Sequence, residues 1–515
     1  MRLLKNTLAN TAGAFLGPLL AIFLTPFYIR HLGLEGFGLV GFFSAFSMLL
    51  GIVTAAMGKV YLRDIAARAS APDRASTIPA LFQAFMLIFL TIGAAVGLSV
   101  AGASWVISHR LVHLHQLQPT VVQVCVVLIG AFLGCSFPTG ICVDTLAALE
   151  EQVQANVIVM AVNLATTAVA ATAVYWTHSV VAYYTATTAG ALVTLLVLWL
   201  QSARSLRARI PVASAWPSFG KALRSSLSDA RALARASLGL IWTEAAGVAI
   251  TQTDRMLIAS GLPLSSLGTY NVGNSLGRLV QMLCNGYIGA AFPRICAAAA
   301  GPRQDFAATL AFRQQGVVMT LVCSVALPVC AVPDSILRLW IGKPEVVMEA
   351  SGITLMFAIA YGCLALAGPP YNYAVAIGKV RYAAICNLIS VVWYPFLGFW
   401  LVSHYGLKGA AMLWLVYCVQ AVIITTLFAG IFLSRAYCSW VELGRMLLLP
   451  ICAWGIGWLI RLAPADPFYP DASRIFYACI GSLLTFCIGV PLVIGLEKTW
   501  ELSSRFTAWR NHPGS

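Results

Sequence analysis

The chain is a succession of long apolar segments separated by short polar ones. An α-helix needs roughly 20 mostly apolar residues to cross a bilayer. Segments near that length lie at about 6–29, 36–58, 77–107, 120–143, 154–176, 179–200, 237–261, 268–293, 314–333, 350–375, 383–402, 409–433, 446–463 and 474–495. The pattern predicts an all-α polytopic membrane protein with about 14 transmembrane helices.

The composition agrees with this prediction. The chain is 60% hydrophobic and only 10% charged, whereas soluble domains usually carry about 25% charged residues. The first apolar segment follows the short basic start MRLLKN and lacks an A-x-A cleavage pattern. It is therefore expected to be a first span and not a cleaved signal peptide.

The distribution of lysine and arginine predicts the orientation. If the N-terminus is cytoplasmic, 23 of the 32 basic residues lie in inner segments, 7 in outer loops and 2 within spans. This bias follows the positive-inside rule and predicts that both termini are cytoplasmic. The net charge of +14 then reflects topology, and nucleic acid is not an expected partner.

The polar segment at 201–236 is the longest inner loop and carries seven basic residues. It divides the chain into an N-lobe of six helices (1–200), this cytoplasmic linker (201–236), a C-lobe of six helices (237–433), and helices 13 and 14 with a tail (434–515). HLGLEGFGLVG at 31–41 and ASGLPLSSLGTYN at 259–271 are weakly alike, which suggests a duplicated six-helix lobe around a central cavity. The linker orients the chain and meets anionic lipid, or alternatively binds a cytoplasmic partner.

One span carries a polar stripe. Asn271, Asn274, Arg278, Gln281 and Asn285 recur at spacings of three and four, which places them within an arc of roughly 80° on a helix. Facing lipid, an arginine at mid-depth alone costs about 2.5–3.5 kcal/mol. The stripe therefore predicts a wet cavity that binds an anionic substrate through these five residues.

The preceding span offers further candidates. Glu244 and Arg255 share a helix face, with Asp254 beside it. We expect Arg255 to line the cavity, although an arginine near the outer interface can also extend its charge to water. Glu244 and Asp254 are candidates for proton or sodium coupling, because an intramembrane carboxylate can change its charge during transport. The alternative for Arg278 is a structural ion pair with one of these two carboxylates.

Motifs for catalysis do not emerge. The 14 cysteines include no C-x-x-C pair, the 7 histidines are scattered apart from His109, His113 and His115 in one outer loop, and no Walker lysine motif occurs. We therefore expect no enzymatic activity, no cofactor and no metal site, and energy from an ion or substrate gradient.

Two segments carry a family resemblance. NTLANTAGAFLGPLLAIFLTPFYIRHLGLEGFGLVGFFSAFSMLL at 6–50 and QTDRMLIASGLPLSSLGTYNVG at 252–273 resemble the first two helices and the seventh-to-eighth helix junction of bacterial polysaccharide flippases. These O-antigen, capsule and exopolysaccharide exporters belong to the multidrug/oligosaccharidyl-lipid/polysaccharide exporter superfamily. The turn LAALEEQVQAN departs from the family, because Glu150 and Glu151 stand where basic residues are commoner.

The resemblance implies two six-helix lobes, alternating access and a cargo of oligosaccharide linked to undecaprenyl pyrophosphate. It also implies a location in the bacterial cytoplasmic (inner) membrane. It implies membrane lipids as partners, with a polysaccharide polymerase and export machinery as further candidates. Three alternatives differ in class: a flippase for peptidoglycan precursors, a multidrug or cation antiporter of the same superfamily, and a polysaccharide polymerase or ligase. An antiporter favours an acidic cavity, and a polymerase or ligase usually needs a larger outer loop than the sequence offers.

Overall fold

The computed structural model describes residues 2–69, 75–209, 219–300, 304–379, 381–433 and 440–494. Regular structure in these ranges is helical, and the one β-type contact is an isolated bridge between His113 and Pro263. The chain forms two compact units, Met1–Gly268 and Thr269–Ser515. The boundaries predicted for the lobes and linker remain a prediction.

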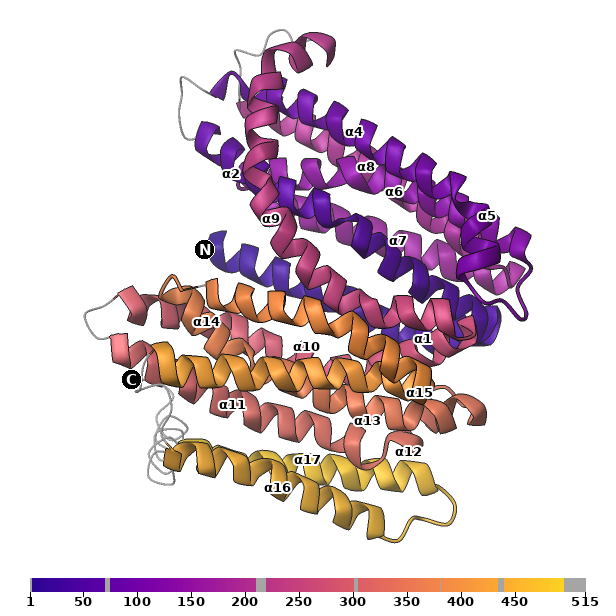
Figure 1. The fold of residues 1–515 in the computed structure, drawn as a ribbon, viewed down its shortest axis with the longest axis vertical. Helices are drawn as coiled ribbons and strands as arrows, with labels where there is room; N and C mark the ends of the chain where they lie inside the picture. The colour runs from indigo at the N-terminus through magenta and orange to yellow at the C-terminus, as the bar shows by residue number, and fades with distance from the viewer. Residues whose placement is uncertain are drawn as a thin grey trace, which may run out of the picture. The chain divides into compact units, whose positions relative to one another are not determined.

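Figure 1 labels the helices of both units. Before residue 264 these are α1 (Arg2–Leu50), α2 (Ile52–Ala69), α4 (Ile78–Gly102), α5 (Ser104–Val106), α6 (Pro119–Ala148), α7 (Gln152–Thr177), α8 (Val180–Arg209) and α9 (Phe219–Gly261). They are followed by α10 (Leu264–Ala300), α11 (Gln304–Ala331), α12 (Pro333–Trp340), α13 (Pro344–Leu366), α14 (Gly368–Ala376), α15 (Arg381–Phe428), α16 (Trp440–Leu462) and α17 (Pro470–Ile494). The described residues also contain two short π-helical turns, η1 (Ile107–Leu111) and η2 (Ala429–Leu433).

The all-α polytopic membrane fold is confirmed. All fourteen segments expected to span the membrane coincide with helix in the described residues. Eight helices in that part of the chain are long and apolar enough to cross a bilayer by length and composition. The 49-residue α1 and the 48-residue α15 each contain one glycine with non-helical backbone angles, Gly33 (φ 75°) and Gly406 (φ 56°). Glycine tolerates positive φ without a Cβ clash, so each long element turns where the sequence predicts the end of one span and the start of the next.

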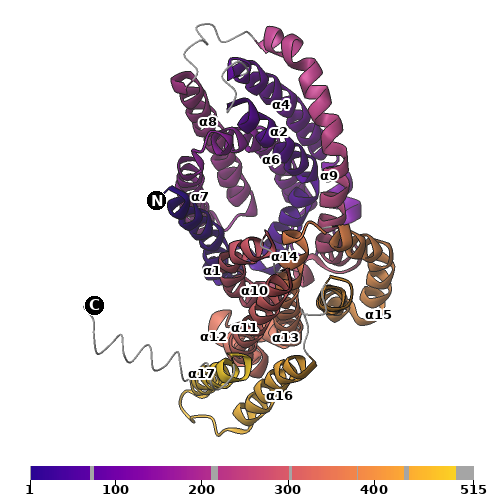
Figure 2. The ribbon, with the colours of Figure 1, turned by 90° about the vertical axis from the view of Figure 1, so that its left-hand side faces the viewer.

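The first unit contains a close crossing of α4 and α6, which lie side by side in Figures 1 and 2. Gly93 and Gly97 on α4 face Gly134 and Gly130 on α6, and a methyl group built on Gly97 or Gly130 would overlap the carbonyl oxygen of the other. Small residues four apart let membrane helices approach backbone to backbone. Both helices carry this G-x-x-x-G spacing, which is the sequence signal for the crossing.

A second close crossing joins the two segments of weak internal similarity. A methyl group on Gly38 would overlap the carbonyl oxygen of Leu264, and one on Gly268 would overlap that of Leu34. Position 34 is equivalent to 264 and position 38 to 268, because each pair is separated by 230 residues. The two contacts therefore join equivalent positions of the two segments. A two-fold relation between equivalent segments produces such a reciprocal contact, which agrees with the predicted duplication.

Glu35 ties the loop between η1 and α6 to α1. Its carboxylate is 3% exposed and accepts hydrogen bonds from the backbone N–H groups of His115 (2.8 Å), Gln116 (2.6 Å) and Leu117 (3.2 Å). The carbonyl oxygen of His113 in the same loop accepts the backbone N–H of Leu264 at 3.1 Å. Three charge-assisted bonds offset the cost of burying the carboxylate, so the loop between η1 and α6 is fixed in place.

In the second unit, α16 and α17 pack together and against α11, as both views show (Figures 1 and 2). Leu327 and Ala331 of α11 form a buried apolar cluster with Ile460 of α16 and Ala478 of α17. The two helices expected to be extra to the C-lobe therefore bury part of their surface on α11.

Candidate functional site

The helix α10 carries the predicted polar stripe, and glycines set its distance from α13. A methyl group on Gly277 would overlap the Cβ atom of Phe357, and one on Gly273 would lie 3.0 Å from the Ile353 side chain. These glycines let the two helices pack with their backbones close together. The face of α10 that includes Gly273 and Gly277 is therefore covered by α13.

The contact with α13 divides the five stripe residues. Asn271 (8% exposed) and Asn274 (7%) are buried, and Asn274 Oδ1 accepts a hydrogen bond from the Tyr361 hydroxyl at 2.6 Å. Gln281 is half-buried, whereas Arg278 and Asn285 are exposed. The buried end of the stripe is thus engaged in helix packing, and the exposed end is open to a ligand.

The open end contains the charge. Among the described residues of its own unit, Arg278 makes no hydrogen bond or ion pair. Its five N–H donors have no partner in the described part of this unit, and a guanidinium binds phosphate or carboxylate through two parallel hydrogen bonds. Asn271 adds an unsatisfied donor, because its buried Nδ2 has no partner among the described residues.

On α9 the predicted residues form a local polar chain. Asp254 is 4% exposed, and its Oδ1 accepts the backbone N–H of Arg255 at 2.8 Å. Nη1 of Arg255 donates to Oε1 of the buried Gln252 at 3.0 Å. The Arg255 guanidinium is therefore oriented by Gln252. Glu244 lies within α9, and its side chain is outside the described residues.

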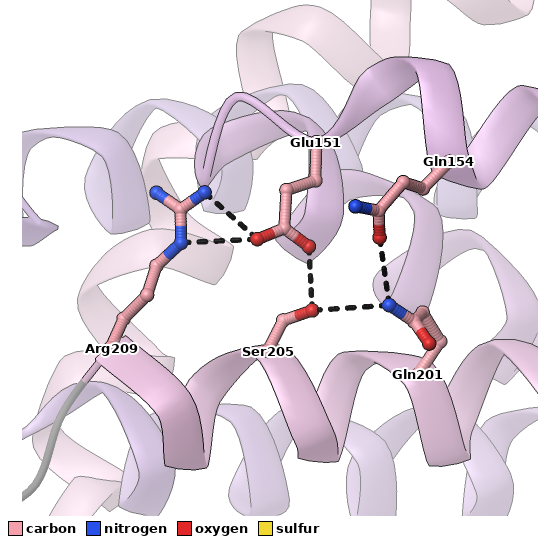
Figure 3. A network of polar contacts seen from close by, with 5 residues as sticks. All are labelled: Glu151, Gln154, Gln201, Ser205 and Arg209. Atoms are coloured by element: carbon pink, nitrogen blue, oxygen red, sulfur yellow. Dashed lines mark hydrogen bonds and ion pairs between the residues drawn. The ribbon is translucent and has the colours of Figure 1, made fainter.

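In the acidic turn that departs from the family pattern, Glu151 is paired locally (Figure 3), whereas Glu150 is exposed. Glu151 accepts hydrogen bonds from Arg209 Nη2 at 2.8 Å, from Arg209 Nε at 3.0 Å and from the Ser205 hydroxyl at 2.5 Å. Gln201 donates to Gln154 across the same two helices at 2.7 Å. Glu151 therefore fastens the end of α8 to the start of α7, and its charge is not available to repel a passing anion.

A second ion-pair group fastens the other end of the basic segment 201–236. Arg68 of α2 pairs with Asp64 at 2.7 Å and with Asp229 of α9 at 2.8 Å. Burial lowers the pKa of Arg68, but hydrogen bonds to Asp229 and Asp64 outweigh it and leave the pKa above its ordinary value. The expectation for this segment rested on its basic residues, yet an acidic residue within it, Asp229, makes the contact.

A large apolar cavity of about 830 Å³ lies within the second unit, among α11, α13, α15 and α16. Its walls include Met319, Leu427, Trp454 and Trp458, and Arg461 stands at one end. The Arg461 guanidinium is committed to the carbonyl oxygens of Ala331 (2.9 Å) and Cys330 (2.8 Å). The cavity therefore offers a hydrocarbon surface and little free charge, whereas the exposed end of the stripe carries the charge of Arg278.

Long apolar helices packed into two compact units are typical of a polytopic membrane protein. The profile of the polysaccharide biosynthesis protein family matches residues 3–298, and the MatE profile matches residues 248–400. The first match covers more than half of the chain. The chain therefore belongs to the polysaccharide biosynthesis protein family, and the predicted membership in its exporter superfamily is confirmed. A sequence search of curated proteins finds no match.

Solved structures show the same fold at low identity. The lipid II flippase MurJ in an inward closed conformation superposes with a TM-score of 0.72 at 10% identity, over 95% of this chain and 98% of the flippase. An inward-facing multidrug resistance MATE transporter gives 0.63 at 12% identity, over 84% and 95%. The MATE multidrug transporter DinF-BH gives 0.54 at 15% identity, over 85% and 97%. The similarity extends over nearly the whole length of these transporters and establishes the fold.

Proposed function

We propose that the protein flips an oligosaccharide linked to undecaprenyl pyrophosphate across the bacterial cytoplasmic membrane, by alternating access between an N-lobe (1–200) and a C-lobe (237–433). The observation that carries this proposal is Arg278: an exposed guanidinium, without a partner among the described residues of its own unit, in a polysaccharide biosynthesis protein. It lies on α10, which we expect to span the membrane. Such a cation needs an anionic ligand or water to offset its cost within the membrane.

The neighbours of Arg278 suit a glycan attached to a phosphate group. A pyrophosphate matches the planar fork of arginine, and Arg255 is a second candidate for it. The amides of Gln281 and Asn285 offer donors and acceptors for sugar hydroxyls, with Asn271 and Asn274 behind them on the same helix. The lipid tail needs only an apolar surface, which the cavity beside Trp454 and Trp458 provides.

Two further features belong to this proposal. The orientation has both termini in the cytoplasm, because basic residues concentrate in the expected inner segments. The product on the outer face is a lipid-linked repeat unit, which a polysaccharide polymerase and export machinery would consume. The glycan belongs to the class of O-antigen or exopolysaccharide repeat units.

Reconstitution tests the function directly. Proteoliposomes carry a fluorescent lipid-linked oligosaccharide in both leaflets, and an external reductant quenches the outer leaflet. The protein is expected to move the inner-leaflet molecules outward, so that their fluorescence is lost at a rate proportional to protein content. Parallel vesicles carry lipid II or a fluorescent organic cation. Faster movement of lipid II would favour a peptidoglycan-precursor flippase, and cation movement alone would favour a multidrug antiporter. Glycan polymerisation or transfer during the assay would indicate an enzyme instead.

Energy coupling is expected to depend on Glu244 or Asp254. Changing the responsible carboxylate to its amide, Glu244→Gln or Asp254→Asn, removes the group that changes charge, so a proton or sodium gradient should no longer accelerate flipping. The gradient-free rate should stay within about twofold of the unmodified protein, since neither group is assigned to substrate binding. Flux with and without an imposed gradient measures both quantities. If both variants respond to the gradient like the unmodified protein, the carboxylates have no coupling role.

A further inference from the structure

A small cavity in the second unit brings two arginines from different helices together. It measures about 320 Å³ and lies between α10 and α11. Arg294 lines it from α10, and Arg313 lines it from α11. Ala290 and Ala291 also line it, and their short side chains leave the space open. The cavity is separate from the Arg278 stripe and is not part of the function proposed above.

The charge in this cavity is uncompensated. Arg294 and Arg313 are both exposed, and neither forms an ion pair or hydrogen bond with a described residue of its unit. The residues that line the cavity include no aspartate or glutamate. Two guanidinium groups around one small space repel each other unless an anion lies between them. A ligand with one compact anionic group would be held from two sides.

A buried amide narrows the class of ligand. Gln314 lines the cavity and is only 3% exposed, and its Nε2 donates to the carbonyl oxygen of Ile288 at 3.2 Å. Its Oε1 has no hydrogen-bond partner among the described residues. A buried acceptor without a partner is costly, so a ligand that donates a hydrogen bond there is favoured. The preferred ligand therefore combines an anion with a nearby hydroxyl or amine.

The depth of the cavity indicates a lipid. Arg294 precedes the end of α10 at Ala300 by six residues, and Arg313 follows the start of α11 at Gln304 by nine. At about 1.5 Å per residue these positions lie roughly 9 and 14 Å from the helix ends. The 37-residue α10 is about 55 Å long and exceeds the roughly 40–45 Å thickness of a bilayer with its headgroups. The spans expected from the sequence end at 293 and begin at 314, so we place both arginines at the level of lipid headgroups.

We propose that this cavity binds the phosphate of an anionic phospholipid whose headgroup carries a hydroxyl, such as phosphatidylglycerol. Arg294 and Arg313 hold the phosphate from opposite helices, and the headgroup hydroxyl donates to Gln314 Oε1. The orientation expected from the sequence places this site in the cytoplasmic leaflet. A bound lipid here fixes the α10–α11 hairpin, the same α10 that carries Arg278.

Lipid binding to the purified full-length protein tests the site without any transport assay. The binding of phosphatidylglycerol, phosphatidylcholine and inorganic phosphate is compared by native mass spectrometry. Ligand-induced shifts of the thermal unfolding midpoint give a second measure of the same binding. The unmodified protein is expected to bind phosphatidylglycerol about tenfold more tightly than phosphatidylcholine. Arg294→Gln and Arg313→Gln should each abolish this preference, and Arg313→Lys should keep part of it. Ala291→Leu should also abolish it, because the larger side chain fills the cavity and leaves every charge in place.

Arg110→Gln is the matched control, since Arg110 is exposed and lies outside the cavity. Its preference should equal that of the unmodified protein. An equal loss in this control, or an unchanged preference in Ala291→Leu, would show that the cavity is not the site. Displacement of phosphatidylglycerol by millimolar inorganic phosphate would identify free phosphate as the ligand and overturn the lipid assignment. If an arginine variant does not fold, Ala291→Leu still decides the question.

Discussion

Replacing Arg278 by alanine is expected to lower the flipping rate of the lipid-linked oligosaccharide by about 10- to 100-fold, the value of one or two hydrogen bonds to a charged group. The protein should still insert and fold, because Arg278 is exposed and forms no hydrogen bond or ion pair with a described residue of its own unit. Arg278→Lys should recover only part of the rate, since lysine keeps the charge and loses the planar fork. Initial flipping rates in proteoliposomes, normalised to folded protein, measure the effect.

Two further variants separate substrate binding from a structural role. If Arg278 mainly neutralises Glu244, the single change leaves a buried carboxylate without its partner, and Arg278→Met combined with Glu244→Gln should restore both stability and transport. If Arg278 binds the substrate, the double variant stays inactive. Arg110→Ala removes an exposed arginine elsewhere and should transport normally. Normal transport by Arg278→Ala, or full recovery in the double variant, contradicts the substrate-binding role.

Enlarging the glycine crossing between α1 and the start of α10 is expected to destabilise the protein severely. Gly38→Val and Gly268→Val each place a side chain where the backbone of the other segment lies. Overpacking usually costs about 1–3 kcal/mol when side chains can adjust, and a backbone carbonyl adjusts less than a side chain. Thermal unfolding of the purified protein, and the folded yield from membranes, should both fall. Gly140→Ala is the control, because no other described group approaches that position within 4 Å.

The reciprocity of this crossing gives a sharper expectation. Gly38→Ala and Gly268→Ala should have similar costs, because each meets the equivalent carbonyl oxygen of the other segment. Once one methyl group has separated the helices, the second should cost less, so the double variant should be less destabilised than the sum of the two. Strictly additive costs would mean that the two glycines do not share one contact.

The spans and the family were predictable from the sequence because both depend on local information. An apolar stretch of sufficient length forms a helix in the bilayer, which leaves no other way to satisfy its backbone. The glycines at 33 and 406 follow from the same reasoning, since each lies between two apolar stretches that are separately long enough to span. The glycines of the Gly97–Gly130 contact are also visible in the sequence as two G-x-x-x-G spacings. The sequence does not show that these two helices are partners.

The surroundings of the polar residues were not predictable in this way. The sequence alone determined that Asn271, Asn274, Arg278, Gln281 and Asn285 share one helix face, because the helical period fixes their directions. Only the tertiary structure decided that Asn274 is bound to Tyr361, 87 residues away, while Arg278 is exposed. It likewise decided that Glu151 pairs with Arg209 and that Arg294 and Arg313 line one cavity. The physical reason is that the period of a helix orders its own side chains, whereas the partner of each one is set by the helix that packs against it.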